Sequence, residues 1–250
     1  TLGEKDSRLD HGTLIPLRFL EAFNLSFEVV RIGLSGLPMI DHYRFGESIA
    51  KVADKLDRRI VIIASGDLSH KLKQEGPYGF APEGPAFDAD VTSAMEHADF
   101  LKLLTYEPGF YERAAECGLG SFAIMAGALD GMAVDPELLS YEGPFGVGYA
   151  VAAFYPAGKA SDRHFEKQYE RWEETRLKDL KSQEDAYVRL ARYALEAYIK
   201  TGVPAQLPND LPEELTSRQA GVFVSLKKHG KLRGCIGTIS PVTASAAEEI

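Results

Sequence analysis

The sequence changes character at residue 158, and this boundary constrains the fold more strongly than any other feature. From 158 to 184 acidic and basic residues alternate, with only a thin seam of apolar side chains. Such a charge pattern is typical of a solvated connecting helix. We therefore expect two globular units, residues 1–157 and 185–250, joined by a helical linker over residues 158–184.

Segments of strand type and helix type alternate through the first unit. Short β-rich or apolar runs predict strands, and apolar residues at helical spacing predict helices. The run at 59–64 becomes continuously apolar after Arg59, which is typical of a strand buried on both faces. The predicted strands are 27–32, 59–64, 138–141 and 147–155, and the predicted helices are 45–56, 85–98, 107–115 and 121–129. This order predicts an α/β fold in which helices flank a mixed sheet.

The second unit is predicted to be of α+β type. Asp185 can cap a helix that ends at Gly202. Two strands are expected at 221–226 and 231–239, forming a hairpin whose turn contains His229-Gly230.

Both ends of the chain lead to an expectation about completeness. The sequence begins with Thr1 in place of Met, and its last residues, up to Ile250, have a helical pattern without a cap. We expect that the first unit lacks its N-terminal part and that the second unit is truncated.

Charge and cysteine content exclude several classes of protein. The chain of 250 residues has a formal net charge of −9, which argues against nucleic-acid binding, since that needs a basic face. No apolar run approaches the length of a membrane span. Two cysteines, Cys117 and Cys235, cannot form a disulfide framework, so we expect reduced thiols and a cytoplasmic protein. Cys235 lies between apolar residues of a predicted strand and is interpreted as a packed thiol.

His70 is the leading candidate for acid–base chemistry. It ends the segment Ser65-Gly66-Asp67-Leu68-Ser69-His70, which directly follows the predicted strand at 59–64. Ligand sites in open α/β sheets lie beyond the carboxyl ends of strands, and imidazole exchanges protons near neutral pH. The alternative is a histidine that only caps or fills the core.

Two further segments carry candidate site residues. His11 follows Asp10, which could orient an imidazole, but by itself this segment predicts a turn into a helix that begins near Pro16. Glu116 and Cys117 interrupt two predicted helices, and either side chain could bind a metal ion. The alternatives are a surface acid at a helix end and a small buried thiol.

Two other segments resemble functional motifs but do not have the features that those motifs require. The glycine-rich segment 143–148 leads into a strand, whereas a phosphate-binding loop needs a following helix. Ser69 and His70 are neighbours, and side chains of neighbouring residues usually point apart, so they do not predict a serine hydrolase.

Taken together, Asp10-His11-Gly12, Ser65-Gly66-Asp67-Leu68-Ser69-His70 and Glu116-Cys117-Gly118 resemble the later part of the LigB-like class III extradiol dioxygenases, a family that includes the Memo-like proteins. The resemblance covers about residues 1–155. Leu232-Arg233-Gly234-Cys235-Ile236-Gly237 resembles the start of an AMMECR-type domain. The two parts in one chain resemble the fused proteins of the AmmeMemoRadiSam system.

The resemblance implies a non-haem Fe(II) centre, with Cu or Zn as alternatives, whose two histidine ligands belong to segments absent from this sequence. It places the third metal ligand at Cys117, with Glu116 one residue earlier, and it gives His70 an acid–base role and His11 a place lining the site. Ring-cleaving members have a carboxylate at the third position, while Memo-like members have cysteine.

Two functions follow from the resemblance. One is cleavage of a catecholic or related aromatic substrate with O₂. The other is a Memo-like role in binding a metal or a peptide without ring cleavage. The same resemblance implies a radical-SAM partner protein and is compatible with a homo-oligomer.

Overall fold

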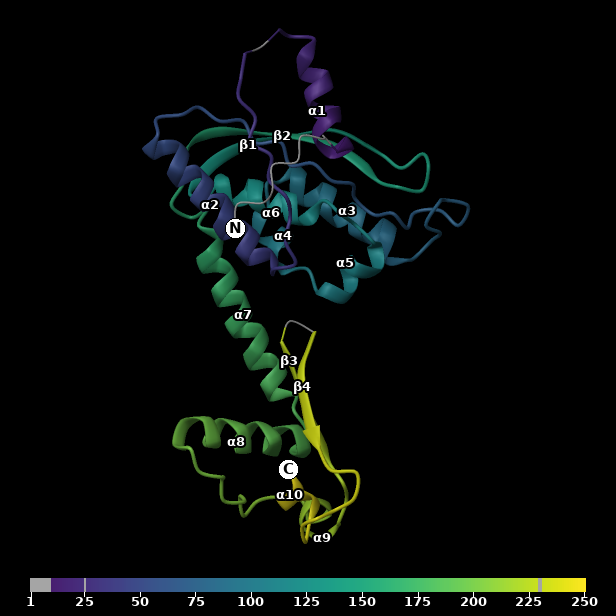
Figure 1. Cartoon of the computed structure of the whole chain (residues 1–250), viewed down its shortest axis with the longest axis vertical. Helices are drawn as coiled ribbons and strands as arrows, with labels where there is room; N and C mark the ends of the chain where they lie inside the picture. The colour runs from purple at the N-terminus through teal and green to yellow at the C-terminus, as the bar shows by residue number, and fades with distance from the viewer. Residues whose placement is uncertain (1–9, 25, 229–230) are drawn as a thin grey trace. The chain divides into compact units, whose positions relative to one another are not determined.

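The computed structural model describes residues 10–24, 26–228 and 231–250 of the chain (Figure 1). These residues divide into two compact units, Thr1–Glu170 and Arg171–Ile250, each described here by itself. No helix among the described residues is both long and apolar enough to cross a membrane.

Among the described residues, each unit contains helices and one antiparallel pair of strands. In chain order the elements are α1 His11–Glu21, α2 Met39–Lys55, α3 Glu83–Glu96, α4 Phe100–Thr105, α5 Pro108–Ala114, α6 Leu119–Ala128, β1 Met132–Glu142, β2 Tyr149–Lys159, α7 Phe165–Ser182, α8 Ala186–Thr201, α9 Glu213–Ser217, β3 Phe223–Lys228, β4 Lys231–Gly237 and α10 Ala246–Glu249. The predicted fold class, helices combined with a sheet in each unit, is confirmed, and each sheet of the described residues is one antiparallel pair. The short helices α4 and α9 were not expected.

The core of the first unit lies where α2, α3, α4 and α6 pack together against the β1–β2 pair (Figure 1). Its fully buried side chains include Tyr43, Phe87, Phe100 and Leu119. The helices form where they were predicted because apolar residues at helical spacing give each of them one buried face.

Helices α2 and α6 touch through their backbones. A Cβ atom placed on Gly46 would lie 1.9 Å from the carbonyl oxygen of Ile124, and one placed on Gly127 would lie 1.9 Å from the carbonyl oxygen of Tyr43. Only glycine at both positions allows this approach of the two helix backbones.

The strands predicted at 27–32 and 59–64 are wrong. Neither segment belongs to a helix or a strand, and no strand of the described residues pairs with either of them. Val30 is 84% exposed and Val61 is 89% exposed, so the second segment is not buried on both faces. An apolar run specifies a strand only when a neighbouring strand binds its backbone groups.

The strands predicted at 138–141 and 147–155 are confirmed, and they extend further than the sequence pattern indicated. β1 pairs with β2 antiparallel. At one end of the ladder Met132 is opposite Lys159, and at the other end Glu142 is opposite Tyr149. The glycine-rich segment 143–148 connects them, and its position matters for the site described below.

The second unit has a small core of its own. The caps predicted for α8 are confirmed, since Asp185 accepts a hydrogen bond from the Val188 amide and Gly202 ends the helix with a φ of +72°. Leu190 and Leu215 are its largest buried side chains. β3 and β4 pair antiparallel, while the predicted turn at His229-Gly230 lies outside the described residues.

The first helix begins earlier than Pro16. α1 starts at His11 because the carboxylate of Asp10 accepts a hydrogen bond from the Thr13 amide at 2.8 Å and caps the helix. Asp10 therefore caps α1, and among the described residues its carboxylate forms no hydrogen bond with an imidazole.

Candidate metal site

The segment that ends at His70 is held by backbone hydrogen bonds on two sides. On one side, the Leu68 amide donates to the carbonyl of Gly148 at 2.9 Å, and the Gly148 amide donates to the carbonyl of Ser69 at 2.8 Å. On the other side, the His70 amide donates to the carbonyl of Ala114 at 3.1 Å. The loop that carries His70 is thus fixed between the β1–β2 connection and the end of α5.

A close backbone contact brings Asp67 against Cys117. A Cβ atom placed on Gly66 would lie 2.3 Å from the Cα atom of Gly118, so only glycine fits there. The Asp67 amide donates to Cys117 Sγ at 3.2 Å, and the Cys117 amide donates to the Asp67 carbonyl at 3.3 Å. These two motifs, far apart in the sequence, form one site.

Three side chains gather at this contact. His70 Nε2 lies 3.4 Å from Asp67 Oδ2 and 3.9 Å from Cys117 Sγ. One ligand atom from each of the three residues lies within 4.8 Å of the others. In the part of the chain that the structure describes, this Asp67–His70–Cys117 cluster is the one group of three or more such side chains with metal-binding spacing.

The spacing of the cluster fits a single ion. A tetrahedral ion with metal–nitrogen and metal–oxygen bonds of about 2.0–2.2 Å and a metal–sulfur bond of about 2.3 Å holds its ligand atoms roughly 3.4–3.6 Å apart. The separation of 3.4 Å between His70 Nε2 and Asp67 Oδ2 matches these values, and the separation of 3.9 Å between His70 Nε2 and Cys117 Sγ exceeds them by a few tenths of an ångström. Imidazole and thiolate favour Zn²⁺, Fe(II) or Cu(I) over Mg²⁺ and Ca²⁺.

Cys117 is accessible to solvent, yet its thiol is partly buried. Burial raises the pKa of the thiol, the hydrogen bond from the Asp67 amide partly offsets this, and the nearby carboxylates of Asp67 and Glu116 raise the pKa further. The free thiol is therefore protonated at neutral pH, and a metal ion must displace that proton in order to bind.

Glu116, the other metal ligand considered from the sequence, points elsewhere. Its Oε2 accepts a hydrogen bond from the Leu119 amide at 2.7 Å, at the first residue of α6. Burial raises the pKa of this carboxyl, while the amides of Leu119 and Gly118 lower it. Glu116 is not a member of the cluster, because its carboxylate holds the start of α6.

His11 is exposed at the start of α1 and also lies outside the cluster. The neighbouring Gly12 packs near the site segment, since a Cβ atom placed there would lie 3.4 Å from Ser65 Oγ. The start of α1 therefore lies beside Ser65, and no contact joins His11 to the three side chains among the described residues.

Asp88 was not predicted from the sequence, and it supports the cluster through Ser69, the residue before His70. Asp88 is only 1% exposed, its Oδ1 accepts from the Ser69 amide at 2.7 Å and its Oδ2 accepts from the Tyr141 hydroxyl at 2.8 Å. Burial raises the pKa of Asp88 despite these two hydrogen bonds. The available signal was a carboxylate on the apolar stripe of the predicted helix, next to Phe87 and Val91.

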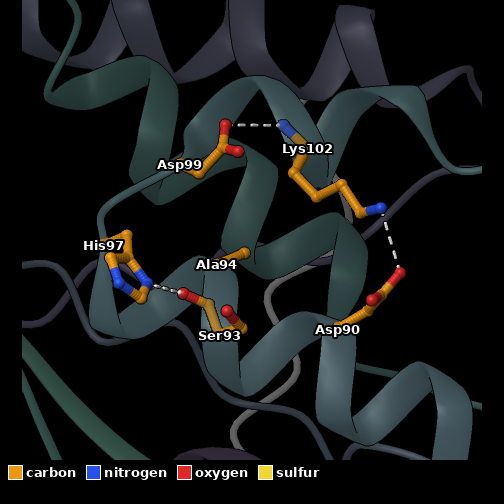
Figure 2. A pocket seen from close by; sticks show the side chains of 6 residues that line it. All are labelled: Asp90, Ser93, Ala94, His97, Asp99 and Lys102. Atoms are coloured by element: carbon orange, nitrogen blue, oxygen red, sulfur yellow. Dashed lines mark hydrogen bonds and ion pairs between the residues drawn. The ribbon is translucent and has the colours of Figure 1, made fainter.

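A separate pocket of about 250 Å³ lies on α3 and α4 and contains none of the predicted site residues (Figure 2). Its charged groups already have partners. Lys102 Nζ lies 3.0 Å from Asp90, and the Lys102 amide donates to Asp99 at 3.1 Å. We assign it no function.

Two family models match separate parts of the chain. Residues 3–152 match the family described as the catalytic LigB subunit of aromatic ring-opening dioxygenase. The chain belongs to the LigB family. Residues 188–250 of this LigB chain match the AMMECR1 family. Both resemblances inferred from the sequence motifs are thereby confirmed.

Several relatives of this LigB chain share its sequence over different lengths. Protein CA_C1420 of Clostridium acetobutylicum is 40% identical over 243 residues, which make up 97% of this chain and 52% of that protein. A protein of Thermotoga maritima is 44% identical over 68 residues, and protein PYRAB00100 of Pyrococcus abyssi is 48% identical over 60 residues. These two matches cover 27% and 22% of this chain, and 39% and 29% of the relatives. The chain thus spans about half the length, or less, of these relatives.

Proposed function

We propose that the LigB part of this chain binds one transition-metal ion through Asp67, His70 and Cys117 and leaves a coordination position for a small molecule. The observation that supports this proposal is the Cys117 thiol 3.9 Å from His70 Nε2, with the Glu116 carboxylate engaged by the Leu119 amide. Three protein ligands with one open position are typical of catalytic metal sites. A thiolate in place of a carboxylate favours the Memo-like function over ring cleavage.

Each residue of the cluster has a distinct part in this proposal. The Cys117 thiol gives up its proton and supplies a soft ligand. His70 supplies a neutral imidazole through Nε2. The Asp67 carboxylate, 3.4 Å from that nitrogen, adds the negative charge that favours a cation. When bound, the ion supplies Lewis acidity or one-electron chemistry at the open position.

Cobalt(II) titration of the 250-residue chain tests the thiolate ligand. We expect a sulfur-to-cobalt charge-transfer band in the wild type and in Cys235→Ser, and its loss in Cys117→Ser. Cys235 is a matched control, because it is the other cysteine and lies in the second unit. It is exposed, so its interpretation as a packed thiol was wrong. A band that persists in Cys117→Ser would contradict the proposal.

The Glu116→Gln variant tests whether Glu116, rather than Cys117, is the metal ligand. Glutamine keeps an oxygen acceptor for the Leu119 amide, so α6 should keep its start, and we expect the cobalt band and the affinity to change less than about twofold. A loss of affinity of tenfold or more would make Glu116 a ligand and would restore the carboxylate typical of ring-cleaving members.

Ring cleavage is the second candidate function, favoured by the description of the matched family and by the place of His70 in the site. In this case His70 exchanges a proton with a catecholic substrate while O₂ reacts, and it is not a ligand. His70→Ala would then keep metal affinity and lose about 10²–10⁴-fold in rate. If the three-ligand proposal holds, His70→Ala instead weakens metal binding itself. Metal titration and assays on a catechol panel with Fe(II) and O₂ distinguish the two.

A further inference from the structure

A loop formed by residues 71–82 folds back over His70. Leu72 and Phe80 form an antiparallel bridge, and the Ala81 amide donates to the Lys71 carbonyl at 3.1 Å. Gly79 turns the chain with a φ of +74°. The ammonium group of Lys71 donates to the Tyr78 carbonyl. These contacts close the loop and place Tyr78 beside His70, the residue that precedes the loop.

The ring of Tyr78 stacks on the imidazole of His70. The ring centroids lie 5.0 Å apart, with 26° between the ring planes. Tyr78 is 54% exposed, while the side chain of His70 is 20% exposed. Since more than half of Tyr78 remains in solvent, this ring does little to fill the core, and its aromatic contact is with His70.

The hydrogen bonds of His70 do not fix the plane of its imidazole ring, and the stacking can do so. Both polar contacts of His70 use Nε2, and no described residue forms a hydrogen bond with Nδ1. The outer nitrogen of a metal-binding histidine is ordinarily held by a carboxylate or a carbonyl, which fixes the plane of the ring. The χ2 torsion of histidine is otherwise broad, so an unsupported imidazole can rotate.

The loop has its own rigid support. The Leu72 amide donates to the Gly146 carbonyl at 3.1 Å, and Lys73 Nζ donates to the Pro144 carbonyl at 2.9 Å. Gly76 packs directly on Gly146, where an added Cβ atom would lie 3.0 Å from the Gly76 Cα atom. The same connection between β1 and β2 therefore supports both the segment that carries His70 and the loop that carries Tyr78.

We propose that Tyr78 is a positioning residue whose ring fixes the imidazole plane of His70, so that Nε2 faces Asp67 and Cys117. The part of this proposal that concerns the orientation of the His70 ring depends only on the stacking geometry. Its consequence for metal affinity rests on the proposed function. The tyrosine hydroxyl has no part in it, so phenylalanine should replace tyrosine fully.

The first test is NMR of the metal-free chain with labelled histidine, with the His70 signals assigned by their loss in His70→Asn. Protons over the face of an aromatic ring are shifted upfield. We expect this shift for the His70 imidazole in the wild type, in Tyr78→Phe and in Phe80→Ala, and its loss in Tyr78→Ala. Phe80 is the matched control, because it is in the same loop and is 50% exposed. Identical His70 signals in the wild type and Tyr78→Ala would overturn the proposal.

The second test is cobalt affinity of the same variants. An aromatic pair of this kind corresponds to about threefold to tenfold in affinity, so Tyr78→Ala should bind about threefold to tenfold more weakly, and Tyr78→Phe and Phe80→Ala within about twofold of the wild type. Unchanged affinity in Tyr78→Ala, with the ring shift lost, would overturn the positioning role. If the wild type itself showed no cobalt band, the proposed function would fail, whereas the NMR comparison would still decide the stacking. Tyr78→Leu serves in place of the alanine variant if that protein does not fold.

Discussion

Gly127→Ala is expected to destabilise the first unit by about 3 kcal/mol or more, the largest effect of any single methyl group that we predict. The added Cβ atom would lie 1.9 Å from the carbonyl oxygen and 2.7 Å from the carbonyl carbon of Tyr43. Both are backbone atoms, so no side-chain rotation can relieve the contact. Helices α2 and α6 would have to separate, and the Leu119 end of α6, which adjoins the site, would move with them.

Urea unfolding of the variants measures this effect, and Gly36→Ala is the control. No atom lies within 4 Å of a Cβ placed on Gly36, which is in the same unit, so its stability should change by less than about 1 kcal/mol. Gly46→Ala, on the facing helix, should resemble Gly127→Ala. Similar stability of Gly127→Ala and Gly36→Ala would show that the two helix backbones are not in contact.

The helices could be predicted from the sequence because their signals are local. Apolar residues at helical spacing gave α2, α3 and α6, and Asp185 with Gly202 gave both ends of α8. The strands at 27–32 and 59–64 could not be judged in the same way. Their apolar content is real, but a strand needs a partner, and a run such as Ile60–Ala64 does not reveal which segment supplies it.

The site could be predicted in part. The motif residues His70 and Cys117 were singled out, and the structure brings them together. The choice between Glu116 and Cys117 depends on which side chain meets the amide of Leu119, a contact that adjacency in sequence cannot reveal. Tyr78 was missed because an exposed aromatic residue in a loop has no periodic pattern that would relate it to His70.

Asp88→Ala is expected to have the second large effect, on stability and on the site together. Removing the carboxylate leaves the Ser69 amide without an acceptor at a residue that is 0% exposed. An unsatisfied buried donor and the lost contacts cost about 2–3 kcal/mol. Because Ser69 adjoins His70, we also expect cobalt affinity to fall about tenfold or more, as is usual when support behind a metal ligand is lost.

Asp88→Asn is the matched variant, and it separates the hydrogen bond from the charge. Its amide oxygen can still accept from the Ser69 amide, and its nitrogen would then face the Tyr141 hydroxyl, which can accept. We therefore expect the site to survive, with cobalt affinity within about threefold of the wild type. Equal losses in the alanine and asparagine variants would mean that the negative charge, and not the hydrogen bond to Ser69, supports the cluster.

Comparing Asp88→Asn with the wild type also predicts how the stability of the protein depends on pH. Burial raises the pKa of Asp88 in the folded protein above that of the unfolded chain, which is about 3.9. The folded state therefore holds this proton more tightly, so the contribution of Asp88 to stability is complete below the unfolded pKa and is lost as pH rises through the folded pKa. Asparagine has no proton to lose, and the other titrating groups cancel in the comparison. The unfolding free energy of Asp88→Asn minus that of the wild type should thus increase between about pH 4 and pH 7, measured by urea unfolding at each pH. A constant difference across this range would mean that the hydrogen bonds from Ser69 and Tyr141 fully offset the burial of the carboxylate.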